Sequence, residues 1–222
     1  MSLVSEFLTI DSDVNDGVDV ELEVKRSRFL TRLRRVTSEE TARAVIDERR
    51  SKFFDARHHC SAFVLGSEDR ASRSSDDGEP AGTAGVPMLT VLTSNHLTDV
   101  VAVVTRYFGG IKLGAGGLVR AYSEAVAHAV ATVGTRRVEL CTLLGIDADF
   151  ANIGTLENSL RGAVLPSGVN VTVEGVDWGD RARITVAVPV TATGEFNSFL
   201  SALSAGSLTA HPTGQRWVDR LG

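Results

Sequence analysis

The chain has 222 residues, 43% of them hydrophobic, and a formal net charge of -5 at pH 7, which allows one large or two small domains with proper cores. Its two cysteines, Cys60 and Cys141, argue against a disulfide framework and fit a reducing cytoplasm. No apolar stretch reaches the roughly 18 residues that a membrane span requires, and the N-terminus lacks the features of a signal peptide. We therefore expect a cytoplasmic protein with no membrane partner.

The charges are unevenly distributed along the chain. Residues 24–57 contain eleven Lys or Arg and five Asp or Glu, whereas residues 138–222 contain five Lys or Arg and nine Asp or Glu. An acidic protein can still bind nucleic acid through one basic face. The acidic total nevertheless argues against a strong, non-specific nucleic-acid binder.

Two strands are predicted at residues 18–24 and 29–36, because polar and apolar residues alternate in both segments. The intervening Lys25-Arg26-Ser27-Arg28 breaks the pattern, so the two strands form an antiparallel pair. We place Arg32, Arg34 and Arg35 on its outer surface. This basic surface either meets solvent and blunts a sheet edge, or forms part of a polyanion-binding face.

A helix is predicted to begin at Thr37, a candidate N-cap, and to continue to Phe53. Glu39 and Glu40 suit the positive end of its dipole. Four cations are placed on its exposed faces: Arg43, Arg49, Arg50 and Lys52.

His58-His59-Cys60 precedes a predicted strand at residues 61–65 and suggests metal binding at first sight. Neighbouring residues of a strand point to opposite faces, so His58 and His59 cannot easily bind one ion. The usual short zinc spacings are also absent. We therefore expect no metal, a packed Cys60 and one hydrogen-bonded histidine.

Residues 66–82 are predicted to form a long polar loop with an acidic centre of Asp76, Asp77 and Glu79. Three nearby carboxylates could hold a cation or act as acid and base. They could equally cap the following helix, predicted from residue 83 to about 95, or solvate the loop. We favour the structural roles.

Residues 100–129 organise the N-terminal half. An apolar run, residues 100–104, predicts a buried strand, and helical spacing of apolar residues begins at Leu118. Between them lies a turn with five glycines: Gly109, Gly110, Gly114, Gly116 and Gly117. Such a turn either allows close packing or, with free N–H groups of the helix, cradles an anion. Three cations accompany it, with Arg120 in the first helical turn: Arg106, Lys112 and Arg120.

The glycine spacing matches neither a P-loop nor a dinucleotide-binding turn. The second half of the chain has a different pattern, with strands predicted at residues 138–147, 169–176, 182–190 and 207–218 and helices at residues 150–163 and 194–203. This β-α-β-β-α-β succession is that of a ferredoxin-like domain. It offers no catalytic constellation.

Five stretches of the chain resemble the YigZ/IMPACT family. They are Lys25-Arg26-Ser27-Arg28-Phe29, Asp55-Ala56-Arg57-His58-His59-Cys60, residues 75–85 (SDDGEPAGTAG), residues 104–114 (VTRYFGGIKLG) and residues 116–122 (GGLVRAY). The resemblance covers about residues 20–130. It implies an α+β protein with two domains: a ribosomal-protein/kinase-like βαβ domain at residues 1–135, and a ferredoxin-like domain, similar to one of elongation factor G, at residues 136–222.

The eukaryotic relative of this family looks like a regulator of translational control. Our leading hypothesis is therefore a non-enzymatic, translation-associated factor that binds RNA, the ribosome or a translation protein. Its anion-binding residues would be Arg106, Lys112 and Arg120 around the glycine turn, with Lys25, Arg26 and Arg28 adding electrostatic attraction. No catalytic residue, metal or cofactor is assigned, and the oligomeric state is left open.

Two alternatives remain at this stage. One is a phosphoryl-transfer or hydrolytic enzyme that combines the glycine turn with the acidic loop and with His58 or His59. The other is a pure protein-interaction module with the acidic C-terminal domain as its docking surface.

Overall fold

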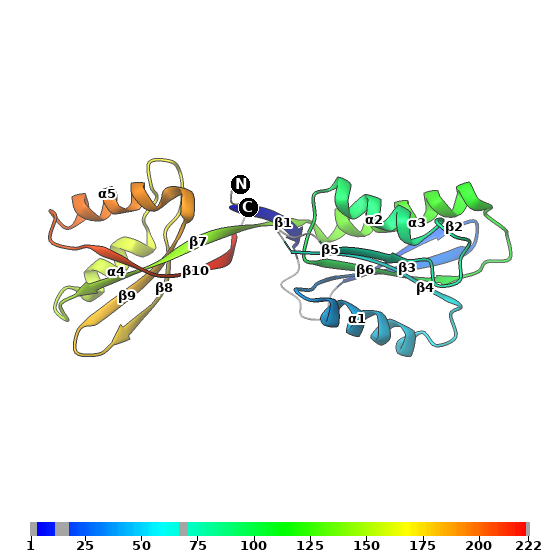
Figure 1. Ribbon diagram of the computed structural model, residues 1–222, viewed down its shortest axis with the longest axis horizontal. Helices are drawn as coiled ribbons and strands as arrows, with labels where there is room; N and C mark the ends of the chain where they lie inside the picture. Colours follow the sequence, from blue (N-terminus) through cyan, green and yellow to red (C-terminus); the bar gives the residue numbers. More distant parts are fainter. Residues whose placement is uncertain (1–3, 12–17, 67–70, 221–222) are drawn as a thin grey trace. The chain divides into compact units, whose positions relative to one another are not determined.

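The computed structural model describes residues 4–11, 18–66 and 71–220 (Figure 1). They divide into two compact units: an N-terminal unit of residues 7–137, and a C-terminal unit of residues 138–220 together with residues 4–6. The expected boundary, between residues 135 and 136, lies two residues from this division. Each unit has its own sheet and hydrophobic core, so the chain has a two-domain α+β fold.

The sheet of the N-terminal unit has the order β2-β3-β6-β4-β5, and neighbouring strands are antiparallel. Its strands are β2 (Val18–Val24), β3 (Ser27–Arg35), β4 (His58–Leu65), β5 (Ala71–Ser75) and β6 (Val100–Tyr107). The central strand β6 is buried on both faces, with Val100 in one core and Val101 in the other. This two-sided burial explains the continuous apolar run of β6.

Three helices cover this sheet, with α1 on one face and α2 and α3 on the other (Figure 1). They are α1 (Glu39–Lys52), α2 (Gly85–Ser94) and α3 (Ala115–Val133). Phe29 and Met88 belong to the core beneath α2 and α3, whereas Ile46 belongs to the core beneath α1. Ser38, and not Thr37 as predicted, caps α1, because its hydroxyl accepts a hydrogen bond from the backbone of Thr41.

The C-terminal unit has the predicted β-α-β-β-α-β succession. Its elements are β7 (Thr135–Ala148), α4 (Ile153–Arg161), β8 (Thr172–Trp178), β9 (Ala182–Pro189), α5 (Thr193–Leu203) and β10 (Ala210–Arg220), with a short 3-10 turn at Val190–Ala192. The strands lie in the order β10-β7-β9-β8. Both helices pack on a core that includes Leu160, Val186 and Phe196. None of the helices in the described ranges is long and apolar enough to cross a lipid bilayer.

Some secondary-structure predictions were wrong. The polar segment 66–82 contains β5, whose side chains are all exposed and therefore show no alternation of polar and apolar residues. Residues 67–70 of that segment lie outside the described residues. The expected connector at residues 135–137 is the start of β7, and β1 (Glu6–Ile10), which was not predicted, pairs with β7.

Two arginines expected on exposed faces are buried instead. Arg49 of α1 is fully buried, and Arg32 of β3 is 7% exposed. Arg49 Nη1 lies 3.0 Å from Asp19 Oδ2, and Arg32 Nε lies 2.8 Å from Asp19 Oδ1. The Arg49 guanidinium also lies 4.3 Å from the centre of the Phe53 ring. The shared carboxylate of Asp19 on β2 makes burial of these two charges tolerable.

Candidate functional site

The stretches that carry the resemblance meet at one end of the N-terminal sheet. The strand register places Arg28 of β3 opposite Tyr107 of β6, and His58 of β4 opposite Arg106 of β6. An open pocket of about 560 Å³ lies there. It is lined by Asp55, Ala56, Arg57, His58, Arg106, Tyr107 and Phe108.

Gly109 joins the β2–β3 turn to the loop that precedes α3. A Cβ atom at this position would lie 2.0 Å from the backbone carbon of Arg26, so only glycine fits. The Gly109 N–H also donates a hydrogen bond to Ser27 Oγ, at 3.2 Å. The basic turn and the glycine loop, predicted as separate anion-binding stretches, therefore form one continuous surface.

The β2–β3 turn has a strained backbone. Val24 pairs with Ser27, so Lys25 and Arg26 alone form the turn, and their φ angles are 47° and 66°. Positive φ costs an ordinary residue on the order of 1 kcal/mol, and Asn-Gly is the usual sequence of such a turn. Strain of this kind clusters at functional sites, which makes this turn a candidate for binding.

Five exposed cations belong to the segments that meet at this end of the sheet or continue from it into α3: Lys25, Arg26, Arg57, Lys112 and Arg120. We call them the basic rim. None of them forms an ion pair with another residue of the described ranges. Arg28, by contrast, is paired with Glu21 at 2.6 Å. Two exposed aromatic side chains accompany the rim, Phe54 at 85% and Phe108 at 59% exposure.

The helix α3 begins within this surface without a capping side chain. Its N-cap is Gly114, with φ of 71°, and its first turn contains no acidic residue. The first N–H groups of α3 thus keep their capacity to bind an anion. No atom lies within 4 Å of a Cβ built on Gly110, Gly114 or Gly116, so the backbone of the loop is accessible. Arg120 is the sixth residue of α3, beyond the first turn in which it was predicted.

Arg106, predicted as an anion contact, is 7% exposed and belongs to a buried polar network. Its Nη1 donates a hydrogen bond to Glu79 Oε1 at 2.6 Å, and the Tyr122 hydroxyl donates to the same oxygen at 2.8 Å. The Cys60 sulfur lies 3.3 Å from the Tyr122 oxygen. Burial raises the pKa of the Cys60 thiol to about 12 and also raises the pKa of Tyr122, so both stay neutral at pH 7.

The remaining residues of the acidic loop bind protein groups. Asp76 accepts hydrogen bonds from the backbone N–H groups of Gly82, Ala84 and Gly85, at 2.8, 3.0 and 2.8 Å, and so caps α2. Partial burial by itself would raise the pKa of Asp76, but these three hydrogen bonds outweigh it and lower the pKa below its ordinary value. Asp77 accepts from the His59 N–H and from Arg50, at 2.7 and 2.9 Å.

The two histidines also have separate partners. His58 Nδ1 lies 2.8 Å from the carbonyl oxygen of Asp77, and His59 Nδ1 lies 3.1 Å from the Thr105 hydroxyl. Burial lowers the pKa of His59, which favours its neutral form. In the part of the chain that the structure describes, no three His, Cys, Asp or Glu side chains are grouped so as to hold a metal ion.

Comparison with known proteins places these features in a family. The Impact N-terminal domain matches residues 25–130, which include the basic rim, the acidic loop and the glycine turn. The IMPACT family member YvyE of Bacillus subtilis is 37% identical over 193 residues, which cover 87% of this chain and 86% of that protein. The chain belongs to the IMPACT family.

Other similarities also extend over both units. YigZ of Escherichia coli is 38% identical over 193 residues, or 86% of this chain and 92% of YigZ. A crystal structure of a hypothetical protein covers 96% of this chain and 99% of its own, at 34% identity and a TM-score of 0.59. The two-domain fold is therefore shared with that solved structure.

Four features of the site were not predicted as such: three exposed side chains and one buried ion pair. Arg57, Phe54 and Phe108 were not singled out, although Arg57 and Phe108 lie within family motifs and Phe54 stands one residue before one. These side chains lie just before β4 begins or just after β6 ends, and this position leaves them exposed. The buried pairing of Arg106 with Glu79 joins residues 27 positions apart and left no periodic signal in the sequence.

Proposed function

We propose that this IMPACT family protein is a non-enzymatic cytoplasmic factor that acts in translation by binding RNA, free or within the ribosome, through the basic rim. The observation that carries this proposal is the set of five exposed cations, unpaired within the described residues, on the segments that meet near an open pocket lined by Arg57 and Phe108. Binding to a translation protein is the alternative outcome of the test below.

The side chains of the rim suit single-stranded RNA. Lys and Arg neutralise phosphate groups, and exposed aromatic rings offer stacking surfaces to bases of any sequence. The uncapped start of α3 adds backbone N–H donors for a phosphate. If all five cations contact phosphates, the logarithm of the binding constant should fall with the logarithm of salt concentration with a slope of about -3.5.

The assignment to translation rests on the family resemblance, in which the eukaryotic relative looks like a translational regulator. The non-enzymatic part of the proposal is supported by the acidic loop, since Asp76, Asp77 and Glu79 each bind different protein groups. Cys60 and Tyr122, which stay neutral and buried, offer no nucleophile at the pocket.

The decisive experiment is co-sedimentation with ribosomes of the host at low and moderate salt, with parallel titration of a fluorescently labelled single-stranded RNA. We expect salt-sensitive binding that Arg57→Ala/Lys112→Ala weakens at least tenfold. A matched control is Arg161→Ala/Arg181→Ala, which removes two exposed charges from the C-terminal unit. Binding that is insensitive to salt, or equal in both variants, would overturn the proposal. Binding to ribosomes that Arg57→Ala/Lys112→Ala does not weaken, without binding to free RNA, would favour a translation protein as the partner.

A further inference from the structure

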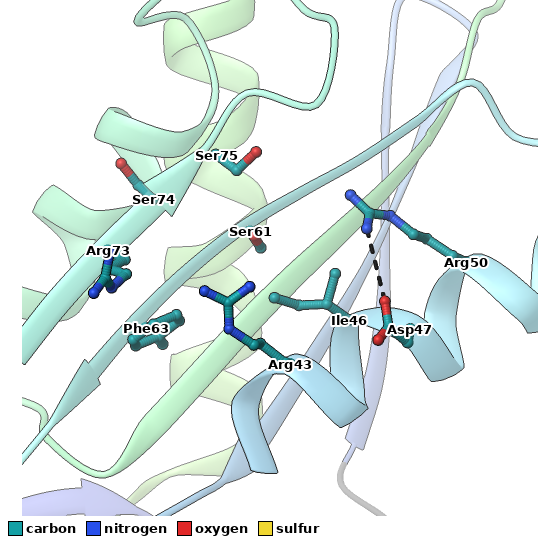
Figure 2. Close-up of a pocket in the computed structure, with 9 residues that line it drawn as sticks. All are labelled: Arg43, Ile46, Asp47, Arg50, Ser61, Phe63, Arg73, Ser74 and Ser75. Carbon is teal, nitrogen blue, oxygen red and sulfur yellow. Dashed lines mark ion pairs between the residues drawn. The ribbon is translucent and has the colours of Figure 1, made fainter. Parts of the chain in front are cut away.

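A second cavity, rich in arginine but also lined by Asp47, lies on the opposite side of the N-terminal sheet from α2 and α3. It is a pocket of about 270 Å³ between helix α1 and strands β4 and β5. We call it the arginine groove and define it by Arg43, Arg50, Ser61, Phe63, Arg73 and Ser75. Figure 2 shows Arg43 and Arg50 projecting from α1 toward the strands, and Arg73 on β5 at the other side of the groove. It shares no residue with the basic rim.

Local geometry explains why these side chains face one another. On the sheet, Ser61 pairs with Ser75, and Phe63 pairs with Arg73, so all four side chains lie on the face that α1 covers. On the helix, Arg43 and Arg50 are seven residues apart, which places them on the same stripe two turns from each other. The groove is therefore built from regular elements, which fix the backbone positions of its residues.

Two of the arginines already share an anion. Arg43 Nη2 lies 2.5 Å from Glu39 Oε1, and Arg73 Nε lies 3.3 Å from Glu39 Oε2. The two guanidinium groups, one from the helix and one from the strand, thus converge on a single carboxylate. A hydrogen bond from Arg43 lowers the pKa of Glu39, so this carboxylate is charged at neutral pH.

The ion pairs in the groove are open to exchange. The side chains of Arg43 and Arg73 are each 64% exposed, and that of Glu39 is 37% exposed. Exposed pairs of this kind contribute little to stability, so an external anion can replace the carboxylate at small cost. Arg50, at the other end of the groove, is shared between Asp47 at 3.7 Å and Asp77 at 2.9 Å.

We propose that the arginine groove binds a phosphate group, presented by a small phosphorylated molecule or by a nucleic-acid backbone, and that Glu39 competes for the same guanidinium groups. Arginine forks match the oxygens of phosphate in geometry and charge. A dianionic phosphate monoester gains more from them than one carboxylate does, and a monoanionic backbone phosphodiester can still accept hydrogen bonds from both forks. The serine hydroxyls supply further donors. The volume of about 270 Å³, slightly below the usual range of ligand pockets, suits one phosphorylated moiety better than a large cofactor.

Because Glu39 and phosphate would compete for the same arginines, two variants should change the affinity for phosphate in opposite directions. Glu39→Gln removes the internal anion and keeps the side-chain shape, so it should tighten phosphate binding at least threefold. Arg43→Ala/Arg73→Ala should weaken the same binding at least tenfold. Because a loss of folding cannot tighten binding, the glutamine variant separates site chemistry from stability. Arg57→Ala/Lys112→Ala, in the basic rim, should leave binding to the groove unchanged.

The experiment is calorimetric titration of the full chain with inorganic phosphate, with AMP and with a single-stranded RNA 10-mer. A small phosphorylated ligand is identified if Glu39→Gln tightens the binding of phosphate and AMP and Arg43→Ala/Arg73→Ala weakens it. A nucleic-acid backbone is identified if only RNA binding responds in this way, measured in a background of Arg57→Ala/Lys112→Ala. Equal affinities in Glu39→Gln, Arg43→Ala/Arg73→Ala and the unmodified chain, or no binding of any probe, overturn the inference. The rim variant keeps that failure distinct from failure of the proposed function.

Discussion

Arg106 and Arg57 line the same pocket, but the structure uses their charges in opposite ways. Arg106 is 7% exposed and bonded to Glu79, within a network that also contains Tyr122 and Cys60. Arg57 is exposed and has no ion partner within the described residues. Both belong to stretches that carry the family resemblance. The comparison teaches that some charged motif residues hold the loops in place, whereas their exposed neighbours remain available to a ligand.

The largest expected effect comes from breaking the buried network. Glu79→Ala leaves the Arg106 charge buried without its carboxylate and the Tyr122 hydroxyl without its acceptor. We expect the free energy of unfolding to fall by about 3–5 kcal/mol. Urea denaturation followed by circular dichroism measures it. Glu124→Ala, an exposed position on α3, should change it by less than about 0.5 kcal/mol; a loss under about 1 kcal/mol in Glu79→Ala would refute a structural role for the network.

A second variant tests the close contact between the β2–β3 turn and the glycine loop at Gly109. Gly109→Ala places a Cβ atom 2.0 Å from the Arg26 backbone, so the turn or the loop must move. We expect a loss of about 3 kcal/mol in the free energy of unfolding, together with weaker RNA binding. Gly116→Ala is the matched control, because its Cβ meets open space in a helix and should stabilise by up to about 1 kcal/mol. Similar stability of the two variants would contradict the close approach.

The helix cap provides a smaller effect. Asp76→Ala removes the acceptor of three backbone N–H groups at the start of α2, and we expect it to cost about 2 kcal/mol at pH 7. The same unfolding measurement applies, with Asp180→Ala as a control at an exposed position of the C-terminal unit. An unchanged unfolding midpoint would show that water replaces the cap.

The Asp76 cap also predicts a dependence on pH. Because folding lowers the pKa of Asp76, the native state binds this proton more weakly than the unfolded chain does. The stabilisation is therefore present above the ordinary pKa of about 4 and is lost as pH falls through the lowered value. The difference in stability between the unmodified chain and Asp76→Ala should shrink between about pH 5 and pH 2. A difference that stays constant over this range would exclude the titration of Asp76 as its cause.

The smallest effect on stability should accompany a clear effect on binding. Lys112→Ala removes one exposed charge of the basic rim and should change the free energy of unfolding by less than about 0.5 kcal/mol. The slope of RNA affinity against salt should become shallower by about 0.7 to 1. Fluorescence anisotropy at several salt concentrations checks it. A loss of stability comparable to that of Glu79→Ala would show that Lys112 stabilises the fold as the buried network does, and would contradict its assignment to an exposed binding surface.

The sequence predicted the elements whose burial is periodic or continuous. The apolar run of β6 and the helix after the glycine turn were found because Val100–Val104 and the stripe of α3 contact the core. The strand β5 was missed, since its five polar residues lie exposed beside β4. An edge strand of this kind is held by backbone hydrogen bonds to the neighbouring strand, and its sequence shows no alternation of polar and apolar residues.

The charged residues were harder to place than the apolar ones. Arg49 continues the buried stripe of Ala42, Val45 and Ile46. Its position on the helix therefore indicated burial, but its charge led to the prediction of an exposed side chain. The partners Asp19 and Glu79 lie 30 and 27 residues from the arginines that they bind. Such pairings depend on the packing of α1 and of the acidic loop, which no local sequence pattern specifies.

The two-residue turn at Lys25 and Arg26 has a consequence for engineering the protein. Replacing it by Asn-Gly would remove the strain of holding Lys and Arg at positive φ and raise the melting temperature, while deleting two charges of the basic rim. Selection for thermal stability alone would therefore favour a more stable hairpin, and we expect that hairpin to bind RNA less tightly. A thermostable descendant obtained in this way should be screened for binding before it replaces the parent chain.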